Sequence, residues 1–467
     1  MSGIIADVDT SSDEDSFMHW NRLLAVCIFL LVDGSSIRAD DWPQYLGPKR
    51  DGVWRETGIV ETLPKAPQYL WRVPVNQGYS GPAVAVGKVF VTDLVPAKDV
   101  KMPKGGFGTS QIPGKERVLC LDEKTGMTLW KQEYECTYRV SYPGGPRCTP
   151  TVDGDRVYTL GTMGDLLCLE VKTGDILWRK NFVKDYEAGV PVWGFASHPL
   201  VTVDKVICLV GGTEGRGVIA FDKWSGKEVW KALTIGGDMG YGVPVIYDVG
   251  KPGKKQLIIW HSHAVVGLDP DTGKRLWSES WEIRAALTAI MPRLIDGNKL
   301  FMSGFYNGSM LLQIDGEKPA VVWKSTSKGT QDSVMPDKTV DLHSIMPTPI
   351  IKDNHIYGVC SYGELRCLKL SGERVWATHE PTTGKSTRWG NAFLIEHGER
   401  CFLFNESGDL ISCKLTPEKY TELSRMKLIE PTNGMAGRPV VWMHPAFANK
   451  NIYARNDKEI VCVSLAK

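Results

Sequence analysis

Val118–Trp130, VLCLDEKTGMTLW, decides the fold of this chain. Val118–Asp122 follows the alternation of period two that is typical of a β-strand. Asp122–Gly126 has turn chemistry, because the aspartate carboxylate can accept hydrogen bonds from backbone N–H groups ahead of it. Gly126 can supply the positive φ that a short hairpin loop needs. Met127–Trp130 then returns as a second strand that ends in a large aromatic residue, so the stretch predicts a β-hairpin.

This hairpin recurs along the chain. Its tryptophans follow one another at spacings of 48, 52, 47, 46 and 53 residues. A repeat of this length that is built from short strands is typical of a propeller. The clear copies are Leu166–Trp178, Val218–Trp230 and Val265–Trp277, and the altered ones are Leu311–Trp323, Leu365–Trp376 and Leu410–Tyr420.

A second recurring phrase precedes each hairpin and holds a proline, an apolar strand, a turn and another apolar strand. Gly81–Asp93 and Thr149–Gly161 are examples. The phrase and the hairpin together give four strands, which make one propeller blade. Seven hairpins follow seven phrases, and an eighth phrase from Arg438 lacks an outer strand. We expect Tyr69–Val75, which carries Trp71, to supply this strand, so that an all-β ring of eight four-stranded antiparallel blades closes without a free edge.

The composition is that of a globular protein with little net charge. Hydrophobic residues make up 42% of the chain and charged residues 23%. The formal net charge of +1 gives no electrostatic case for binding nucleic acid or an anionic membrane surface. We expect three parts, a signal peptide at 1–39, a lead-in segment at 40–66 and a propeller at 67–467.

The N-terminal residues carry the features of a secretory signal peptide, which predicts export to the periplasm or cell envelope. Leu23–Val32 is an apolar run of ten residues, too short to span a bilayer, and Arg22 precedes it. The acidic residues ahead of Met18 do not suit a signal peptide, so we expect translation to start at Met18 and cleavage to follow Ala39. A retained single-pass anchor is the alternative.

The eleven cysteines do not form a disulfide pattern. Five of them fall on the third strand of separate blades, too far apart for a bridge whose Cα atoms must lie within about 7 Å. We expect them to act as small buried hydrophobic residues. These five are Cys120, Cys168, Cys367, Cys413 and Cys462.

The repeat phrase LDxxTGxxLW resembles the tryptophan repeat of the pyrroloquinoline-quinone (PQQ) enzymes. Over residues 41–467 the chain is more similar to the PQQ-binding-like propeller proteins of the BamB type, the lipoprotein of outer-membrane protein assembly. Asp41–Gly52 resembles the start of exported members from planctomycete-type bacteria. The resemblance implies an eight-bladed ring in which each repeat tryptophan docks between adjacent blades. These residues are Trp71, Trp130, Trp178, Trp230, Trp277, Trp323 and Trp376.

The resemblance does not extend to the residues that quinone chemistry uses. Quinoprotein alcohol dehydrogenases hold Ca²⁺ with carboxylate and amide ligands and cover the quinone with a disulfide between adjacent cysteines, whereas this sequence has no adjacent cysteines. Asp341 and Glu187 precede inner strands and could face the channel, but each stands alone. His261 and His263 alternate on one strand without a third ligand. We therefore predict neither catalytic nor metal-binding residues.

One constellation remains for ligand binding. When the blades are aligned on the proline of the inner-strand phrase, aromatic and polar residues recur three positions before it and one position before it. Residues at this place in a propeller approach the mouth of the central channel. The predicted ligand contacts are Tyr79, Arg147, His198, Tyr241, His343, Trp389 and Arg438. Aromatic rings with arginines suit a polar or aromatic ligand or a peptide, and the two arginines would favour a carboxylate or phosphate. The alternative is that these residues simply fill the channel.

The sequence therefore predicts a non-catalytic, exported and monomeric propeller that binds or scaffolds a protein or peptide partner of the cell envelope, without a cofactor. A PQQ-dependent dehydrogenase, which would hold PQQ with Ca²⁺, is the alternative function. A propeller that binds envelope polysaccharide is a further alternative, because fold alone does not fix function.

Overall fold

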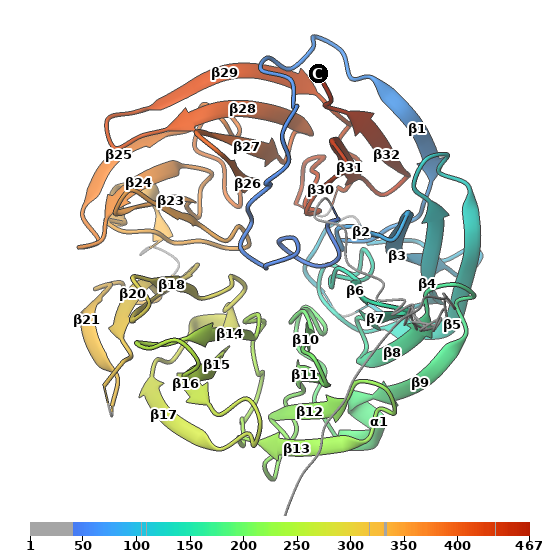
Figure 1. Ribbon diagram of the computed structural model, residues 1–467, viewed down its shortest axis with the longest axis horizontal. Coiled ribbons are helices and arrows are strands. Elements are labelled where there is room, and N and C mark those ends of the chain that lie inside the picture. The colour runs from blue at the N-terminus through green and yellow to red at the C-terminus, as the bar shows by residue number, and fades with distance from the viewer. Residues whose placement is uncertain (1–40, 104, 109, 317, 331–333, 435) are drawn as a thin grey trace, which may run out of the picture. The chain divides into compact units, whose positions relative to one another are not determined.

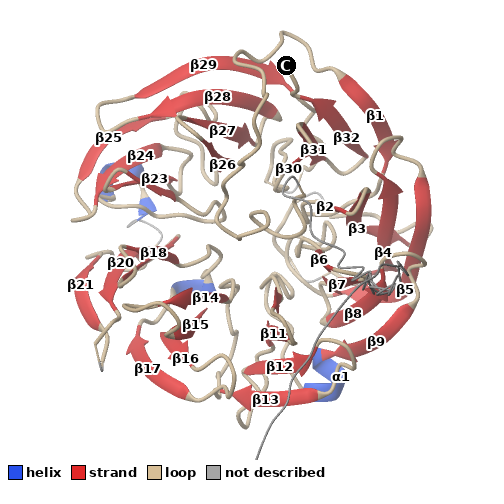
Figure 2. Ribbon diagram, viewed as in Figure 1, coloured by secondary structure: helices blue, strands red, loops and turns tan. Residues whose placement is uncertain are grey.

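The computed structural model describes residues 41–467 apart from 104, 109, 317, 331–333 and 435. The predicted signal peptide and start site fall outside these described residues. Eight four-stranded antiparallel sheets stand around a central axis, as Figure 1 shows. This arrangement confirms the eight-bladed propeller that the repeat predicts. Helical segments lie in loops between strands (Figure 2).

Strands follow one another outward from the axis in chain order within each of the first seven blades (Figure 1). The first two blades consist of β2 (Ala83–Ala85), β3 (Lys88–Pro96), β4 (Ile112–Asp122) and β5 (Thr128–Tyr138), and of β6 (Thr151–Asp153), β7 (Arg156–Leu160), β8 (Asp165–Glu170) and β9 (Ile176–Asn181). The next two consist of β10 (Leu200–Val201), β11 (Lys205–Leu209), β12 (Val218–Asp222) and β13 (Glu228–Ala232), and of β14 (Val245–Asp248), β15 (Lys255–His261), β16 (Ala264–Leu268) and β17 (Arg275–Ser280).

The remaining blades complete the ring. The fifth and sixth consist of β18 (Arg293–Ile295), β19 (Lys299–Gly304), β20 (Gly308–Gln313) and β21 (Ala320–Lys324), and of β22 (Ile350–Lys352), β23 (His355–Val359), β24 (Leu365–Lys369) and β25 (Arg374–Thr378). The seventh and eighth consist of β26 (Ala392–His397), β27 (Arg400–Asn405), β28 (Asp409–Leu415) and β29 (Tyr420–Lys427), and of β30 (Ala446–Ala448), β31 (Asn451–Arg455), β32 (Glu459–Ser464) and β1 (Tyr69–Pro74). The short helices are α1 (Phe182–Tyr186), η1 (Arg284–Ala286) and η3 (Pro336–Lys338).

Asp122 organises the turn of the first outer hairpin, as the sequence predicts. Its Oδ1 atom accepts hydrogen bonds from the backbone N–H of Thr125 at 2.9 Å and from the Thr125 hydroxyl at 2.8 Å. Gly126 has a φ of 72°, in the left-handed region that glycine adopts without strain. A β-bulge in the pairing of β4 with β5 recurs in the six following hairpins. The same turn chemistry recurs at Asp222 and Asp269, which accept from the backbone N–H of Ser225 and Thr272, each at 2.8 Å.

β1 closes the ring as the outer strand of the eighth blade. It pairs antiparallel with β32, with Trp71 opposite Cys462 and Val73 opposite Ile460. Arg72 and Glu459 form an exposed ion pair across the two strands, with 2.6 Å between Nη2 and Oε1. The first strand and the last strand are thereby joined, and β32 is not left as an open edge.

The repeat tryptophans fasten neighbouring blades together. In six of them the indole Nε1 donates to a backbone carbonyl in the hairpin turn of the next blade, over 2.7 to 3.2 Å. These six are Trp71, Trp130, Trp178, Trp230, Trp323 and Trp376. Trp277 differs, because its Nε1 donates to Gln256 Oε1 within its own sheet at 2.6 Å. The hairpin after Trp277 is the one in which the sequence replaces the Thr-Gly turn.

The core consists of apolar side chains packed between adjacent sheets, such as Trp178 of the second blade against Phe221 of the third. All ten cysteines of the described residues are buried and unpaired, which confirms their predicted role as small core residues. Among the described residues, no helix has the length and apolar character needed to cross a membrane.

The lead-in segment crosses the central channel and is bonded to blade after blade (Figure 1). Trp42 exchanges two backbone hydrogen bonds with Val84 of β2, at 2.8 and 2.9 Å. The guanidinium of Arg50 donates to the carbonyls of Pro199 and Pro244, at 3.1 and 3.4 Å. Burial lowers the pKa of this guanidinium to about 10. No pattern in the sequence indicates that this segment lies across the centre of the ring.

The same segment continues to the far side of the ring. The hydroxyl groups of Tyr45 and Thr348 lie 3.3 Å apart. The backbone N–H of Trp54 donates to the carbonyl of Glu396 on β26 at 2.8 Å, and Val60 then reaches the end of the eighth blade. Residues 41–60 therefore close one side of the channel and leave a blind cavity on the other.

Candidate functional site

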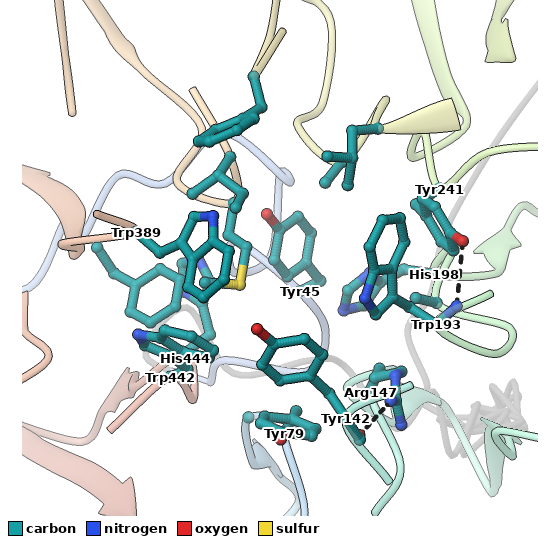
Figure 3. Close-up of a pocket in the computed structure, with 18 of the residues that line it drawn as sticks. Tyr45, Tyr79, Tyr142, Arg147, Trp193, His198, Tyr241, Trp389, Trp442 and His444 are labelled. Carbon is teal, nitrogen blue, oxygen red and sulfur yellow. Dashed lines mark hydrogen bonds between the residues drawn. The ribbon is translucent and has the colours of Figure 1, made fainter. Parts of the chain in front are cut away.

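A cavity of about 230 Å³ lies in the channel, and the lead-in segment closes one end of it. Most of its lining comes from the loops that lead into the innermost strands and from two hairpin loops that carry Phe107 and Phe305. Tyr45 of the lead-in segment and Phe393 of β26 complete it. Figure 3 shows aromatic side chains from different blades converging on this space. We call this cavity the channel pocket.

One position of the repeat supplies a lining residue from every blade. It stands three residues before the proline that precedes the innermost strand, or before Ala392 in the seventh blade, which has no proline there. In blade order these residues are Tyr79, Arg147, Ala196, Tyr241, Ala289, Met346, Trp389 and Trp442, and all of them line the channel pocket. Two blades place alanine where the others place a larger side chain, and this leaves the cavity open.

Five of the seven residues predicted for ligand contact line the channel pocket, namely Tyr79, Arg147, His198, Tyr241 and Trp389. The structure places the other two elsewhere. His343 is buried, and its Nδ1 lies 3.0 Å from the carbonyl oxygen of Phe305. Arg438 pairs with the buried carboxylate of Glu406, with 2.7 Å between Nη2 and Oε1.

The prediction of Arg438 depends on Pro439, which does not precede an innermost strand. The apolar run after Pro439 reads like an inner strand, but the innermost strand of the eighth blade is β30, which follows Pro445. Counting back from Pro445 gives Trp442 and His444, and both line the channel pocket. The position three residues before the innermost-strand proline therefore lines the pocket in the eighth blade as well, once Pro445 is taken in place of Pro439.

The lead-in segment closes the pocket with an aromatic stack that sequence reasoning missed. The rings of Tyr45 and His198 are stacked with their centroids 4.0 Å apart, and His444 meets Tyr45 edge-on at 4.9 Å. Tyr45 belongs to the Asp41–Gly52 stretch, whose aromatic residues and glycines were a signal for packing. The opposite wall holds Tyr142, which meets Trp389 edge-on at 6.1 Å (Figure 3).

Arg147 is the one charged side chain of the lining, and its donors are occupied by the protein. Its Nη2 donates to the carbonyls of Ser141 and Tyr142 at 3.1 and 2.6 Å, and its Nη1 donates to the carbonyl of Gly145. Its guanidinium also lies 5.2 Å from the ring centroid of Tyr79. These contacts fix the loop before β6 and leave no forked donor pair for a carboxylate or phosphate ligand.

Within the described part of the chain, two histidines place buried ring nitrogens without a hydrogen-bond partner in the lining of the pocket. His198 Nδ1 and both ring nitrogens of His444 are buried and have no hydrogen-bond partner among the described residues. Burial lowers the pKa of His444 to about 3 and holds the pKa of His198 well below its usual value. Both rings are therefore neutral near pH 7, and each can offer an uncharged donor or acceptor.

The lining does not resemble a metal centre. The pocket walls contain no carboxylate in the described part of the chain. No group of three or more histidine, cysteine, aspartate or glutamate side chains with the geometry to hold a metal ion occurs among the described residues. The donors that a quinone with Ca²⁺ would use are thus not assembled around this cavity.

Comparison with known proteins identifies the family. Two overlapping stretches, residues 114–378 and 263–467, match the profile of the family described as outer membrane protein assembly factor BamB. The chain belongs to this family. No curated protein sequence gives a significant match to it.

Solved structures share the fold of this BamB-family chain at low sequence identity. BamB from Moraxella catarrhalis is 14% identical with a TM-score of 0.52, and the match covers 85% of this chain and 97% of that one. Quinohemoprotein alcohol dehydrogenase from Comamonas testosteroni is 13% identical with a TM-score of 0.57, and covers 93% and 82%. A europium-containing methanol dehydrogenase is 14% identical with a TM-score of 0.54, and covers 91% and 89%. At these sequence identities the structural similarity shows a shared fold and nothing further.

Proposed function

We propose that this BamB-family propeller is a non-catalytic, exported binding protein of the cell envelope that holds a protein partner at the channel pocket. The observation that carries the proposal is the convergence of one repeat position from all eight blades on a single cavity. Concave sites lined by aromatic residues with a few polar groups are where proteins bind ligands and anchor side chains. The family description, an assembly factor, supports a protein partner.

The chemistry of the lining favours binding over catalysis. Its titratable groups are tyrosines, buried neutral histidines and one arginine held by backbone carbonyls. A quinone dehydrogenase needs a metal cage and a general base beside the substrate. The described lining has no side-chain amide or carboxylate, groups that commonly pair with sugar hydroxyls, and this favours a protein partner over a polysaccharide.

Photo-crosslinking in native cells tests the proposal. A benzophenone amino acid replaces Phe107, whose ring lies at the pocket entrance and is 65% exposed. We expect the full chain to crosslink there to a defined envelope protein. The control replaces Trp224, a half-exposed residue in the outer turn of the third blade.

A second variant shows whether the cavity itself matters. Ala289→Trp fills the pocket with a residue that the equivalent positions of two other blades already carry, Trp389 and Trp442. We expect this variant to fold and to lose the crosslink from position 107. Crosslinking that survives the filled pocket, or that arises equally from position 224, contradicts the proposal.

A further inference from the structure

We infer that the channel pocket binds one uncharged aromatic side chain, a phenol or an indole, on an extended segment of the partner polypeptide. This inference rests on the proposed function and names the group that the pocket recognises. It follows from the size of the cavity, the arrangement of its rings, its neutral polar atoms and the loops around its mouth.

The size of the cavity suits one substituted ring. A protein cavity of about 150 Å³ accepts benzene, and the channel pocket measures about 230 Å³. The extra volume corresponds to a ring with a hydroxyl group and its methylene link, or to a fused pair of rings. Ala196 and Ala289 create this space, because other blades fill the same position with tyrosine, tryptophan, methionine or arginine.

The walls present ring faces and edges at several angles. Tyr142 is edge-on to Trp389, and Trp193 is edge-on to Tyr241 with centroids 5.7 Å apart. Aromatic pairs prefer such edge-to-face geometry, so an incoming ring finds partners on opposite sides (Figure 3). The chain already holds one ring at this wall, since Phe107 meets Tyr142 edge-on at 5.3 Å and lies 5.6 Å from Trp389.

The polar atoms of the pocket select a ring that carries a hydrogen-bonding group. His444 lines the pocket, is nine-tenths buried, and has both ring nitrogens without a partner among the described residues. A phenol O–H or an indole N–H can pair with such a neutral nitrogen. The fixed charge of Arg147 disfavours an ammonium group in the same space, and its occupied donors offer little to a carboxylate.

The loops at the mouth favour a polypeptide over a free aromatic molecule. The loops that line the pocket also carry apolar side chains in water, with Phe107 65% exposed and Val192 52%. Phe107 is itself a lining residue, and Val192 directly precedes the lining residue Trp193. A small molecule inside the cavity would leave these side chains exposed, whereas a chain that enters with one side chain covers them.

Calorimetry with short synthetic peptides tests the inference. The peptides share a valine- and serine-rich sequence and differ in one central residue, which is tyrosine, tryptophan, leucine, lysine or glutamate. We expect the tyrosine and tryptophan peptides to bind the full chain about tenfold more tightly than the leucine peptide, and the charged peptides to bind weakest. Ala289→Trp should abolish binding of both aromatic peptides, and Trp224→Ala should leave it unchanged.

Four further results would overturn the inference in whole or in part. Leucine or lysine peptides that match the tyrosine peptide overturn the ligand class. Free p-cresol or indole that binds as tightly as the peptides overturns the polypeptide occupant. If the aromatic preference fails while Ala289→Trp still removes the crosslink from position 107, the inference is wrong and the proposed function stands. If the crosslink also survives, both are wrong.

Discussion

The indole of Trp178 lies directly over Gly226 in the hairpin turn of the next blade. A Cβ atom on Gly226 would stand 2.8 Å from Trp178 Cδ2, closer than real Cβ contacts allow. The indole Nε1 also donates to the carbonyl of Lys223 in that turn at 3.0 Å. Three other pairs repeat this relationship: Trp71 with Gly126, Trp130 with Gly174, and Trp230 with Gly273. Trp323 and Gly372 form a looser version of it, at 3.1 Å. The glycine of the repeat is therefore required both by its turn and by its neighbour's tryptophan.

Replacing either member of this pair should destabilise the ring. Trp178→Ala removes a buried indole and should lower the free energy of unfolding by about 3–5 kcal/mol. Gly226→Ala adds strain at a φ of 68° and displaces the indole, and should cost about 1–3 kcal/mol. Denaturant unfolding measures both values. Trp224→Ala, two residues from Gly226 and half exposed, is the matched control and should change the free energy by less than about 0.5 kcal/mol.

The sequence predicts the structural features that depend on neighbouring residues, and it does not predict the contacts between residues that are distant in the chain. The Asp122–Gly126 turn and its hairpin are local, and they recur, so the blades and their number follow from the pattern alone. The channel position could be predicted because residues at the same position of the repeat occupy the same place in every blade. Tyr79 and Tyr241, which both line the pocket, are examples. Pro439 was mistaken for Pro445 because the apolar residues after it have the pattern of a strand, although they do not pair with a neighbouring strand.

The lead-in segment shows the limit of such reasoning. Its partners are backbone groups of distant blades, such as the carbonyls of Pro199 and Pro244 that accept from Arg50. Because every residue has a backbone carbonyl, the sequence does not show which of them accept a hydrogen bond. The stack of Tyr45 on His198 could not be predicted either, because the two residues are remote in the chain and share no repeat position.

Ring closure by β1 should matter more than any single tryptophan. A chain that begins at Asn76 lacks β1 and exposes the edge of β32, whereas a chain that begins at Gln68 loses the lead-in segment but keeps the closing strand. We expect the shorter chain to aggregate and to melt well below the longer one. Size-exclusion chromatography and thermal unfolding compare them. Equal melting of the two chains contradicts closure by β1.

Arg438 should act through Glu406 and not through a ligand. Arg438→Ala leaves the buried Glu406 carboxylate without its cationic partner and should lower the free energy of unfolding by about 1–3 kcal/mol. Glu406→Gln in the Arg438→Ala background removes the stranded charge and should recover part of the loss. A double-mutant cycle should give a coupling free energy of at least about 0.5 kcal/mol. Additive effects of the two substitutions would refute the pairing.

Addition of PQQ and Ca²⁺ should produce no dye-linked oxidation of alcohols or sugars. The reason lies in the donors, because no carboxylate lines the described pocket and the sequence has no adjacent cysteines to cover a quinone. A calorimetric titration with PQQ and Ca²⁺ checks binding separately from turnover. Turnover that Asp341→Ala abolishes would reverse the assignment and favour the dehydrogenase.

His444 should make the fold sensitive to acid. Burial lowers its pKa from the ordinary 6.5 to about 3 in the folded protein. Between these values the unfolded chain binds a proton that the folded chain excludes, so the stabilising contribution is present above pH 6.5 and is lost as the pH falls. The loss attributable to this residue should reach about 2 kcal/mol at pH 5.

The variant His444→Phe isolates this contribution, because an apolar ring can pack between Tyr45 and Phe393 without titrating. Asp341, whose pKa burial raises to about 6, acts in the opposite sense, but it is present in both proteins and its effect cancels. Between pH 7.5 and pH 5 the variant should therefore lose about 2 kcal/mol less unfolding free energy than the parent, whatever its stability at neutral pH. Denaturant titrations at both pH values measure this difference. Parallel losses in the two proteins would mean that His444 is protonated in the folded state, and that the pocket carries a charge which its recognition of an uncharged ring does not allow.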